Sequence, residues 1–377
     1  MLERFVDLHS FPFIFLIILV SFFLIQAAYY LLVFIRLAVA RPGKINDTKE
    51  GVSVIICAHN EYYNLKANLP LILQQDYPEY EVLVVNHASE DDTSYLLSDL
   101  QREYPHLKSL EIKNDLNFFT GKKFPLAIGI RSAKYNKLLL TDADCRPSSA
   151  NWISCMQSAY NNNIKIVLGY GSYSRAKGLL NKLIRFDTAH VATQYLSYAM
   201  SGLPYMGVGR NLSYLKSEFF DHHGFISHYR ISSGDDDLFI NKIAKRSNTA
   251  VMIHPDSFTC SEPKHTFRHW IYQKKRHLTT SSHYRPLHKF LLGLYSLSLL
   301  CFYMLTILMF SLDYSVVPVA GLVFLRMILQ YTVLAGCFRK LNENDLILPL
   351  PLLEIVLLLL NTGIGLSNIF YKPNKWK

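Results

Sequence analysis

The sequence predicts an α/β domain, built on a mostly parallel sheet flanked by helices, with transmembrane helices near both ends of the 377-residue chain. Three observations predict this architecture. Short apolar strands alternate with helical patterns over roughly 240 residues, as in successive βαβ units. Apolar runs long enough to cross a bilayer flank this region. Half of the residues are hydrophobic, and 24 Tyr and 23 Phe are many for a soluble protein.

The first apolar run extends from Phe11 to Ile35. It is long enough to span a membrane and too long for the hydrophobic region of a cleaved signal peptide. Glu3 and Asp7 precede it, whereas basic residues from Arg36 onward follow it, so the positive-inside rule places the next domain in the cytosol. We expect an integral membrane protein with residues 1–40 as its anchor, and the compact chain suggests a bacterial inner membrane.

Residues 50–265 carry the pattern of the α/β domain. Strands are predicted at 52–58, 81–86, 110–113 and 137–144, and helices between them at 65–75, 93–104 and 124–133. Ligands of parallel sheets bind at the carboxyl ends of the strands, so functional residues are expected there.

The remaining chain divides into a basic segment, 266–289, and an apolar region, 290–377. Candidate spans are 290–312, 316–338 and 346–371. The middle one carries Arg326 and Gln330, so two spans plus an interfacial or bundle-lining helix remain an alternative to three. The net charge of +10 gathers just ahead of these spans, which favours a membrane flank and no nucleic-acid partner.

Asp142 and Asp144 stand at the end of the strand predicted at 137–144. Side chains at i and i+2 of an extended segment point to the same side, so the pair offers two oxygen ligands to one cation. Mg²⁺ or Mn²⁺ held in this way is typical of phosphate-transfer sites. The alternative is that Asp144 only caps the next helix.

Three consecutive carboxylates, Asp235, Asp236 and Asp237, open a helix predicted from its apolar face. A carboxylate crowded by two others has a raised pKa and can accept a proton from a hydroxyl, as a general base does. The alternative is that these residues only stabilise the amino terminus of the helix.

A third group lies in the segment 267–281. Trp270, Gln273 and Arg276 fall along one side of a helix, where an indole, an amide and a guanidinium can converge on a phosphate or a sugar. The alternative is a basic helix that lies on lipid headgroups, which explains Lys274 and Lys275 without any ligand.

These motifs together resemble a membrane-anchored family 2 glycosyltransferase with the GT-A fold, over about residues 50–285. The stretches that carry the resemblance are "VSVIICAHNE", "VNHASEDDT", "TGKKFPLAIGI", "TDAD", "GDDD" and "QKKRH". The resemblance implies nucleotide-binding roles for Ala58, Asn60, Glu61, Asn86, His87, Lys122 and Asp142. Acceptor-binding roles are expected for Asp235, Trp270, Gly209 and Arg210.

The resemblance implies a metal-dependent, inverting transfer from a nucleoside diphosphate sugar, a UDP-sugar first, to a lipid or lipid-linked saccharide at the cytosolic membrane face. Asp236 is the expected base, and Arg276 and Gln273 complete the catalytic set. Alternatives are a processive polysaccharide synthase, a transport or scaffold protein with a regulatory domain, and a non-catalytic binder of nucleotide sugars. The last is motivated by Asn86 and His87, which stand where the family carries aspartates.

Overall fold

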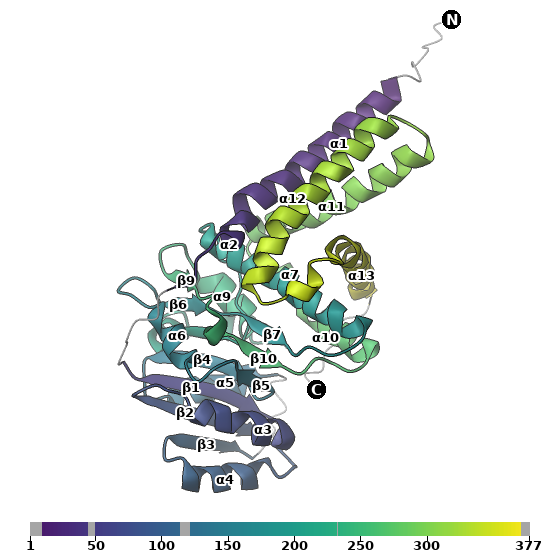
Figure 1. Ribbon diagram of the computed structural model, residues 1–377. Coiled ribbons are helices and arrows are strands. Elements are labelled where there is room, and N and C mark those ends of the chain that lie inside the picture. The colour runs from purple at the N-terminus through teal and green to yellow at the C-terminus, as the bar shows by residue number, and fades with distance from the viewer. Residues whose placement is uncertain (1–9, 44–49, 114–120, 232, 371–377) are drawn as a thin grey trace, which may run out of the picture.

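The computed structural model describes residues 10–43, 50–113, 121–231 and 233–370 (Figure 1). An α/β domain forms one end of the molecule, and long helices extend from it (Figure 1). Glu3, Asp7, Lys44 and Lys49, on which part of the orientation argument depends, lie outside the described residues.

The main sheet has seven strands in the order β3-β2-β1-β4-β8-β6-β9. Strands β1 to β4 are parallel to one another, and a crossover helix joins each of them to the next along the chain. Strand β8 runs antiparallel to both β4 and β6. The strands are β1 (Val52–Ala58), β2 (Tyr80–His87), β3 (Leu107–Ile112), β4 (Lys137–Asp142), β6 (Ile166–Leu168), β8 (Leu212–Leu215) and β9 (Thr249–Val251). The crossover helices are α3 (Tyr62–Leu73), α4 (Thr93–Glu103) and α5 (Lys123–Ser132).

These elements confirm the predicted α/β pattern, with ends shifted by a few residues. One shift affects the site: β4 ends at Asp142, and Asp144 lies in the turn that follows rather than in an extended strand. The argument from strand alternation was therefore wrong in its geometry for this pair.

A second, three-stranded sheet covers the carboxyl end of β4. Its order is β5-β10-β7, with β5 (Cys145–Pro147), β10 (Thr259–Ser261) and β7 (Gly171–Tyr173). The other helices of the domain are α6 (Trp152–Ser158), α7 (Leu179–Met200), α8 (Lys216–Asp221), α9 (Asp237–Ile243) and α10 (Phe267–Leu278). Short 3-10 turns are η2 (Ile226–His228), η3 (Pro255–Ser257), η4 (Ser281–His283) and η5 (Asn344–Leu346).

Four helical segments of the described chain are long and apolar enough to cross a membrane: 13–38, 286–311, 316–340 and 350–368. The first comprises α1 (Ser10–Ala28), the π-helix η1 (Tyr29–Phe34) and α2 (Ile35–Ala38), and the others are α11 (Pro286–Ser311), α12 (Val316–Lys340) and α13 (Leu350–Phe370). Helices α1, α11 and α12 lie side by side (Figure 1), whereas α13 packs on α7 and α10 of the domain as well as on α12.

The middle C-terminal helix, α12, is thus part of the bundle. Its Arg326 is buried and donates to Glu354 of α13 at 2.7 Å, and that carboxylate is equally buried. A polar pair inside apolar surroundings explains why this helix can carry an arginine.

The domain and the helices share one hydrophobic core. Phe34 of the anchor, Phe186 of α7 and Phe338 of α12 belong to the same buried cluster, and the Phe186 and Phe338 ring centroids are 5.5 Å apart. Beside them the buried guanidinium of Arg185 donates to Glu343 at 3.0 Å and to Asp345 at 2.9 Å. The membrane helices are therefore packed against the domain rather than tethered to it.

Candidate active site

A cavity of about 1440 Å³ opens at the carboxyl end of β4 and continues between α10, α11 and α13. Carboxylates, basic groups and aromatic rings line its domain side. Most of the predicted site residues meet here: Glu61, Lys122, Asp142, Asp144, Gly209, Arg210, Asp235, Asp236, Trp270, Gln273 and Arg276. Parallel strands thus present their ligand-binding edge to this cavity, as the sequence predicted.

Asp142 and Asp144 lie together although a turn separates them. Their carboxylate oxygens and the Cys145 sulfur lie within 4.8 Å of one another. Burial and the neighbouring Asp142 raise the pKa of Asp144, so the two carboxylates repel each other. Asn151, not Asp144, caps α6, so the capping alternative was wrong.

This donor set fits a hard divalent cation. Burial raises the pKa of the Cys145 thiol and keeps it neutral, which leaves the two carboxylates as the ligands that Mg²⁺ or Mn²⁺ prefers. Lys122 forms an ion pair with Asp142 from the side of α5. Burial alone would lower the pKa of Lys122, but Asp142 and Asp235 raise it well above its usual value.

Arg210 lies beside the same carboxylates. Its guanidinium is 4.4 Å from the Tyr173 ring centroid and donates to the Ser172 carbonyl at 3.1 Å. It also lowers the pKa of both Asp142 and Asp144. The structure therefore places Arg210 with the Asp142–Asp144 pair, and its predicted acceptor role stays a prediction.

The three consecutive aspartates have three different environments. Asp236 accepts hydrogen bonds from the backbone N–H groups of Gly209 and Asp237, both at 2.7 Å. Asp237 is buried and accepts from Thr280 and from the Tyr284 hydroxyl. Asp235 lines the cavity, and no hydrogen bond of its side chain is found among the described residues. All three line the cavity, but the Asp237 side chain is buried and engaged by Thr280 and Tyr284, so Asp235 and Asp236 are the two carboxylates more open to the cavity.

Helix α10 brings Trp270, Gln273 and Arg276 to the cavity on one face, as predicted. Gln273 donates to the Tyr173 hydroxyl at 3.2 Å. Lys274 is buried and donates to Asp187 of α7 at 2.5 Å, so the headgroup interpretation was wrong for this lysine. Lys275 donates to Ser367 of α13, also at 2.5 Å, and both lysines join α10 to its neighbours.

The comparison with known families decides the identity. A sequence model described as glycosyl transferase family 21 matches residues 15–362, most of the chain. The chain belongs to glycosyltransferase family 21. The resemblance to GT-A glycosyltransferases and the expected glycosyl transfer are thereby confirmed.

Relatives of this family 21 transferase share shorter stretches with it. A poly-beta-1,6-N-acetyl-D-glucosamine synthase of Staphylococcus epidermidis is 30% identical over 95 residues, which are 25% of this chain and 22% of that protein. An uncharacterized glycosyltransferase of Haemophilus influenzae is 29% identical over 144 residues, 38% of this chain and 41% of that protein. The matches thus span less than half the length of either relative.

The fold is shared over a greater length. The mannosyltransferase PcManGT from Pyrobaculum calidifontis, solved in complex with GDP-Man and Mn²⁺, superposes with a TM-score of 0.57 at 18% identity. The match covers 88% of the family 21 transferase and 98% of that chain. It confirms the predicted fold, with a mostly parallel sheet and flanking helices.

Four residues predicted to bind the nucleotide in this transferase lie at the ends of β1 and β2, outside the lining of the cavity: Ala58, Asn60, Asn86 and His87. Asn86 and Asn60 are engaged by hydrogen bonds within the protein. Asn86 donates to Ser94 at 2.8 Å and to Glu111 at 2.9 Å, and Asn60 accepts from the Glu90 N–H at 2.8 Å. Their nucleotide roles stay predictions.

Tyr173, Thr280 and Tyr284 were not singled out from the sequence. Tyr173 touches both Arg210 and Gln273, and the other two hold Asp237. No sequence motif indicates them, because their partners lie at least 37 residues away along the chain.

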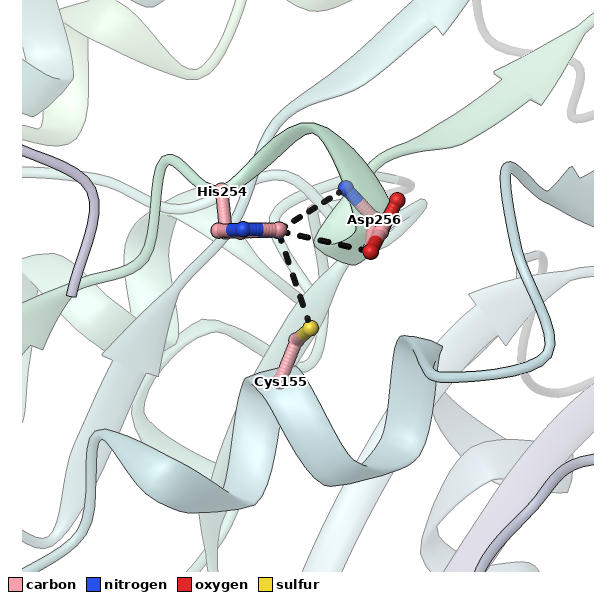
Figure 2. Close-up of side chains that lie close together, drawn as sticks. All are labelled: Cys155, His254 and Asp256. Carbon is pink, nitrogen blue, oxygen red and sulfur yellow. Dashed lines mark hydrogen bonds and ion pairs between the residues drawn. The ribbon is translucent and has the colours of Figure 1, made fainter. Parts of the chain in front are cut away.

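A second group of donor atoms in the transferase lies outside the cavity (Figure 2). His254 Nδ1 accepts the Asp256 N–H at 3.2 Å, is 3.7 Å from an Asp256 carboxylate oxygen and lies 3.9 Å from the Cys155 sulfur. These atoms satisfy one another around the turn η3, so no ligand is needed to explain them.

The protonation of Asp236 should make the stability of the transferase depend on pH. Burial, followed by repulsion from Asp235 and Asp237, raises its pKa to about 8. The folded state therefore holds a proton that the unfolded state releases between about pH 4 and pH 8. We expect the contribution of Asp236 to stability to decline as pH rises through this window. When Tm is measured in detergent from pH 5 to pH 8, it should depend less on pH in Asp236→Asn than in the wild type. An equal dependence of Tm on pH in both proteins would contradict this.

Proposed function

We propose that this protein is an inverting glycosyltransferase that moves a sugar from a nucleoside diphosphate sugar to a lipid or lipid-linked saccharide at the cytosolic face of a membrane. One observation carries the proposal. The same cavity is lined by the Asp142–Asp144 pair, by Asp235 and Asp236, and by apolar residues of the membrane helices α11 and α13. Donor, base and lipid acceptor can therefore meet in one space.

The donor side is formed by the carboxylate pair and three basic groups, Lys122, Arg210 and Arg276, all of which line the cavity. Asp142 and Asp144 would hold Mg²⁺ or Mn²⁺, which neutralises charge on a diphosphate leaving group. The basic side chains bind the remaining phosphate oxygens, and arginine can do so with two hydrogen bonds. We propose a UDP-sugar as donor, with GDP-mannose, the ligand of PcManGT, as the second to be tested.

On the acceptor side, we assign Asp236 as the base that removes the proton of the acceptor hydroxyl. The oxygen then attacks the anomeric carbon from the face opposite the diphosphate in one displacement, so the configuration inverts. Gly209 donates to one oxygen of Asp236 and orients the carboxylate. Asp235 is a second candidate for the base, because each carboxylate oxygen of Asp236 already accepts one hydrogen bond from a backbone N–H group.

The acceptor approaches from the membrane helices. Leu292, Leu300 and Leu357 line the cavity between α11 and α13, and Ser296, Asn361 and Thr362 add polar groups along the same passage. An apolar passage that also carries polar groups suits a lipid with a hydroxylated head. Helix α12 returns to the domain side of the bundle, and α13 packs on α7 and α10 of the domain as well as on α12 (Figure 1). We therefore propose three spans, with α13 at the interface and both α13 and the domain on the cytosolic side.

Gly293 offers a test of this passage. It lines the cavity, and a Cβ added there meets no atom within 4 Å. Gly293→Trp should fold and fill the passage, and we expect transfer to a lipid acceptor to fall by about tenfold or more while nucleotide binding is unchanged. Gly321→Trp is the matched control, because Gly321 is equally open but lies on α12, outside the cavity lining. Equal rates for the two variants would contradict the lipid passage.

The function itself is tested with a panel of nucleotide sugars. Purified protein in detergent receives each donor with lipid extract and Mn²⁺, and released nucleoside diphosphate is measured. Release that depends on the extract supports transfer to a lipid. Binding of nucleotide sugar without release from any donor would instead indicate a non-catalytic binder.

Polysaccharide synthesis is the second candidate. It is favoured by the relatives from Staphylococcus epidermidis, which are named as synthases of poly-beta-1,6-N-acetyl-D-glucosamine. The length of the labelled product distinguishes the two functions. A single added sugar supports single transfer, and a ladder of products supports processive synthesis.

A further inference from the structure

Lys123 is a buried lysine whose ammonium group faces backbone rather than a carboxylate. The residue is only 4% exposed. Its Nζ donates to three carbonyl oxygens, those of His228 at 2.9 Å, Ile231 at 2.5 Å and Ser233 at 2.6 Å. An ammonium has three N–H donors, so its hydrogen-bonding capacity is filled by one short segment of chain.

That segment leads directly into the three aspartates. After the last of these carbonyls, at Ser233, only Gly234 precedes Asp235. Gly234 has a φ of +98°, and a Cβ there would approach Leu238 Cδ1 to 2.5 Å, so the chain enters α9 through a sharp turn that is itself constrained. The position of the carboxylates thus depends on where the carbonyls of His228, Ile231 and Ser233 are held.

The neighbouring Lys122 contacts the donor side of the site. It forms the ion pair with Asp142 and lines the cavity. Two consecutive residues at the start of α5 therefore contact the metal-binding carboxylates and the segment that leads to the base. The helix fixes their separation, because backbone hydrogen bonds hold its first turn.

We propose that Lys123 is a positioning residue that sets the distance between the donor site and the Asp235–Asp236 carboxylates. This inference rests on the proposed transfer function. Lys123 touches no substrate in this scheme. Its ammonium group binds three carbonyls, so the base is held in place before the acceptor binds. A displaced base would lower kcat and leave the affinity for the donor unchanged.

The test uses full-length protein in detergent. Lys123→Met keeps most of the side-chain length and removes all three donors. We expect its kcat to fall by roughly 10- to 100-fold while the KM for the donor changes by less than about twofold, because Lys122 is retained. Lys123→Arg, which keeps a charge and several donors, should recover part of kcat. Should Lys123→Met fail to fold, Lys123→Gln takes its place.

Lys216→Met is the matched control. Lys216 also donates to backbone carbonyls, those of Arg131 at 3.0 Å and Ala133 at 2.7 Å, but it does so at the far end of α5. Its variant should keep kcat. An equal loss of kcat in both variants, or an unchanged kcat in Lys123→Met, overturns the proposal.

Hydrogen exchange separates this inference from the proposed function. In Lys123→Met, amides of 226–238 should exchange faster than in the wild type, and those of β1 to β4 should not. This readout needs no substrate, so it remains decisive if no donor supports transfer. Unchanged exchange in 226–238 overturns the positioning role, whereas absent transfer by wild type overturns only the function.

Discussion

Asp236→Asn is expected to reduce kcat for sugar transfer by roughly 10²- to 10⁴-fold, the range that a general base contributes. The substitution removes the charge that accepts the proton of the acceptor hydroxyl. The Asn oxygen can still accept the Asp237 N–H as a helix cap, so α9 should form. Donor affinity should be nearly unchanged, because the groups expected to bind the diphosphate are retained. Transfer kinetics with a labelled donor and calorimetry with nucleoside diphosphate measure the two effects.

Asp235→Asn is the informative comparison for this prediction. The two variants differ by one position, and both remove a carboxylate from the same cavity. If Asp236→Asn retains activity and Asp235→Asn loses it, the base is Asp235 and the assignment made here is wrong. The pH profile adds a check, because a base with a pKa of about 8 should give a rate that rises toward pH 8 in the wild type.

Asp144→Ala is expected to abolish the dependence of nucleotide binding on a divalent cation. Asp142 and Asp144 are the two carboxylates of the candidate metal group, so the variant keeps only one of them. We expect the affinity for a nucleoside diphosphate in the presence of Mn²⁺ to fall by more than about tenfold, to the level found without metal. Calorimetry with and without Mn²⁺ checks this, and transfer should be lost in parallel.

Asp256→Ala is the matched control for Asp144→Ala. Asp256 belongs to the other group of potential metal ligands, with Cys155 and His254, which lies outside the cavity (Figure 2). Its loss should leave nucleotide binding and its metal dependence unchanged. An Asp144→Ala variant that behaves like this control would remove the metal site from the pair at 142 and 144.

The sequence predicted the first half of the domain well, because its signal is local. Strands β1, β2 and β4 are short apolar runs, and each is buried along most of its length. The prediction that Asp142 and Asp144 lie at a ligand site followed from one rule, that parallel strands present ligands at their carboxyl ends, whereas the meeting of all the motifs was implied by the family resemblance. That rule needs no knowledge of side-chain contacts.

The rest depends on long-range packing. Strands β6, β8 and β9 have only three or four residues, too few for a periodic pattern, and they are stabilised by pairing with distant strands. Lys274 looked like a lipid-facing lysine because its partner, Asp187, is 87 residues away. The distinct environments of Asp235, Asp236 and Asp237 likewise come from partners elsewhere in the chain. Three consecutive aspartates in a sequence do not indicate which partners each of them has.

The buried cluster that joins Phe34, Phe186 and Phe338 also has a practical meaning. A fragment cut at the edges of the α/β domain would leave Phe186 on its surface without the aromatic neighbour from α12, and Arg185 without either carboxylate. Such a fragment would expose a hydrophobic surface that is buried in the intact molecule. The enzyme has to be purified and studied whole, because its α/β domain and its long apolar helices complete each other's interior.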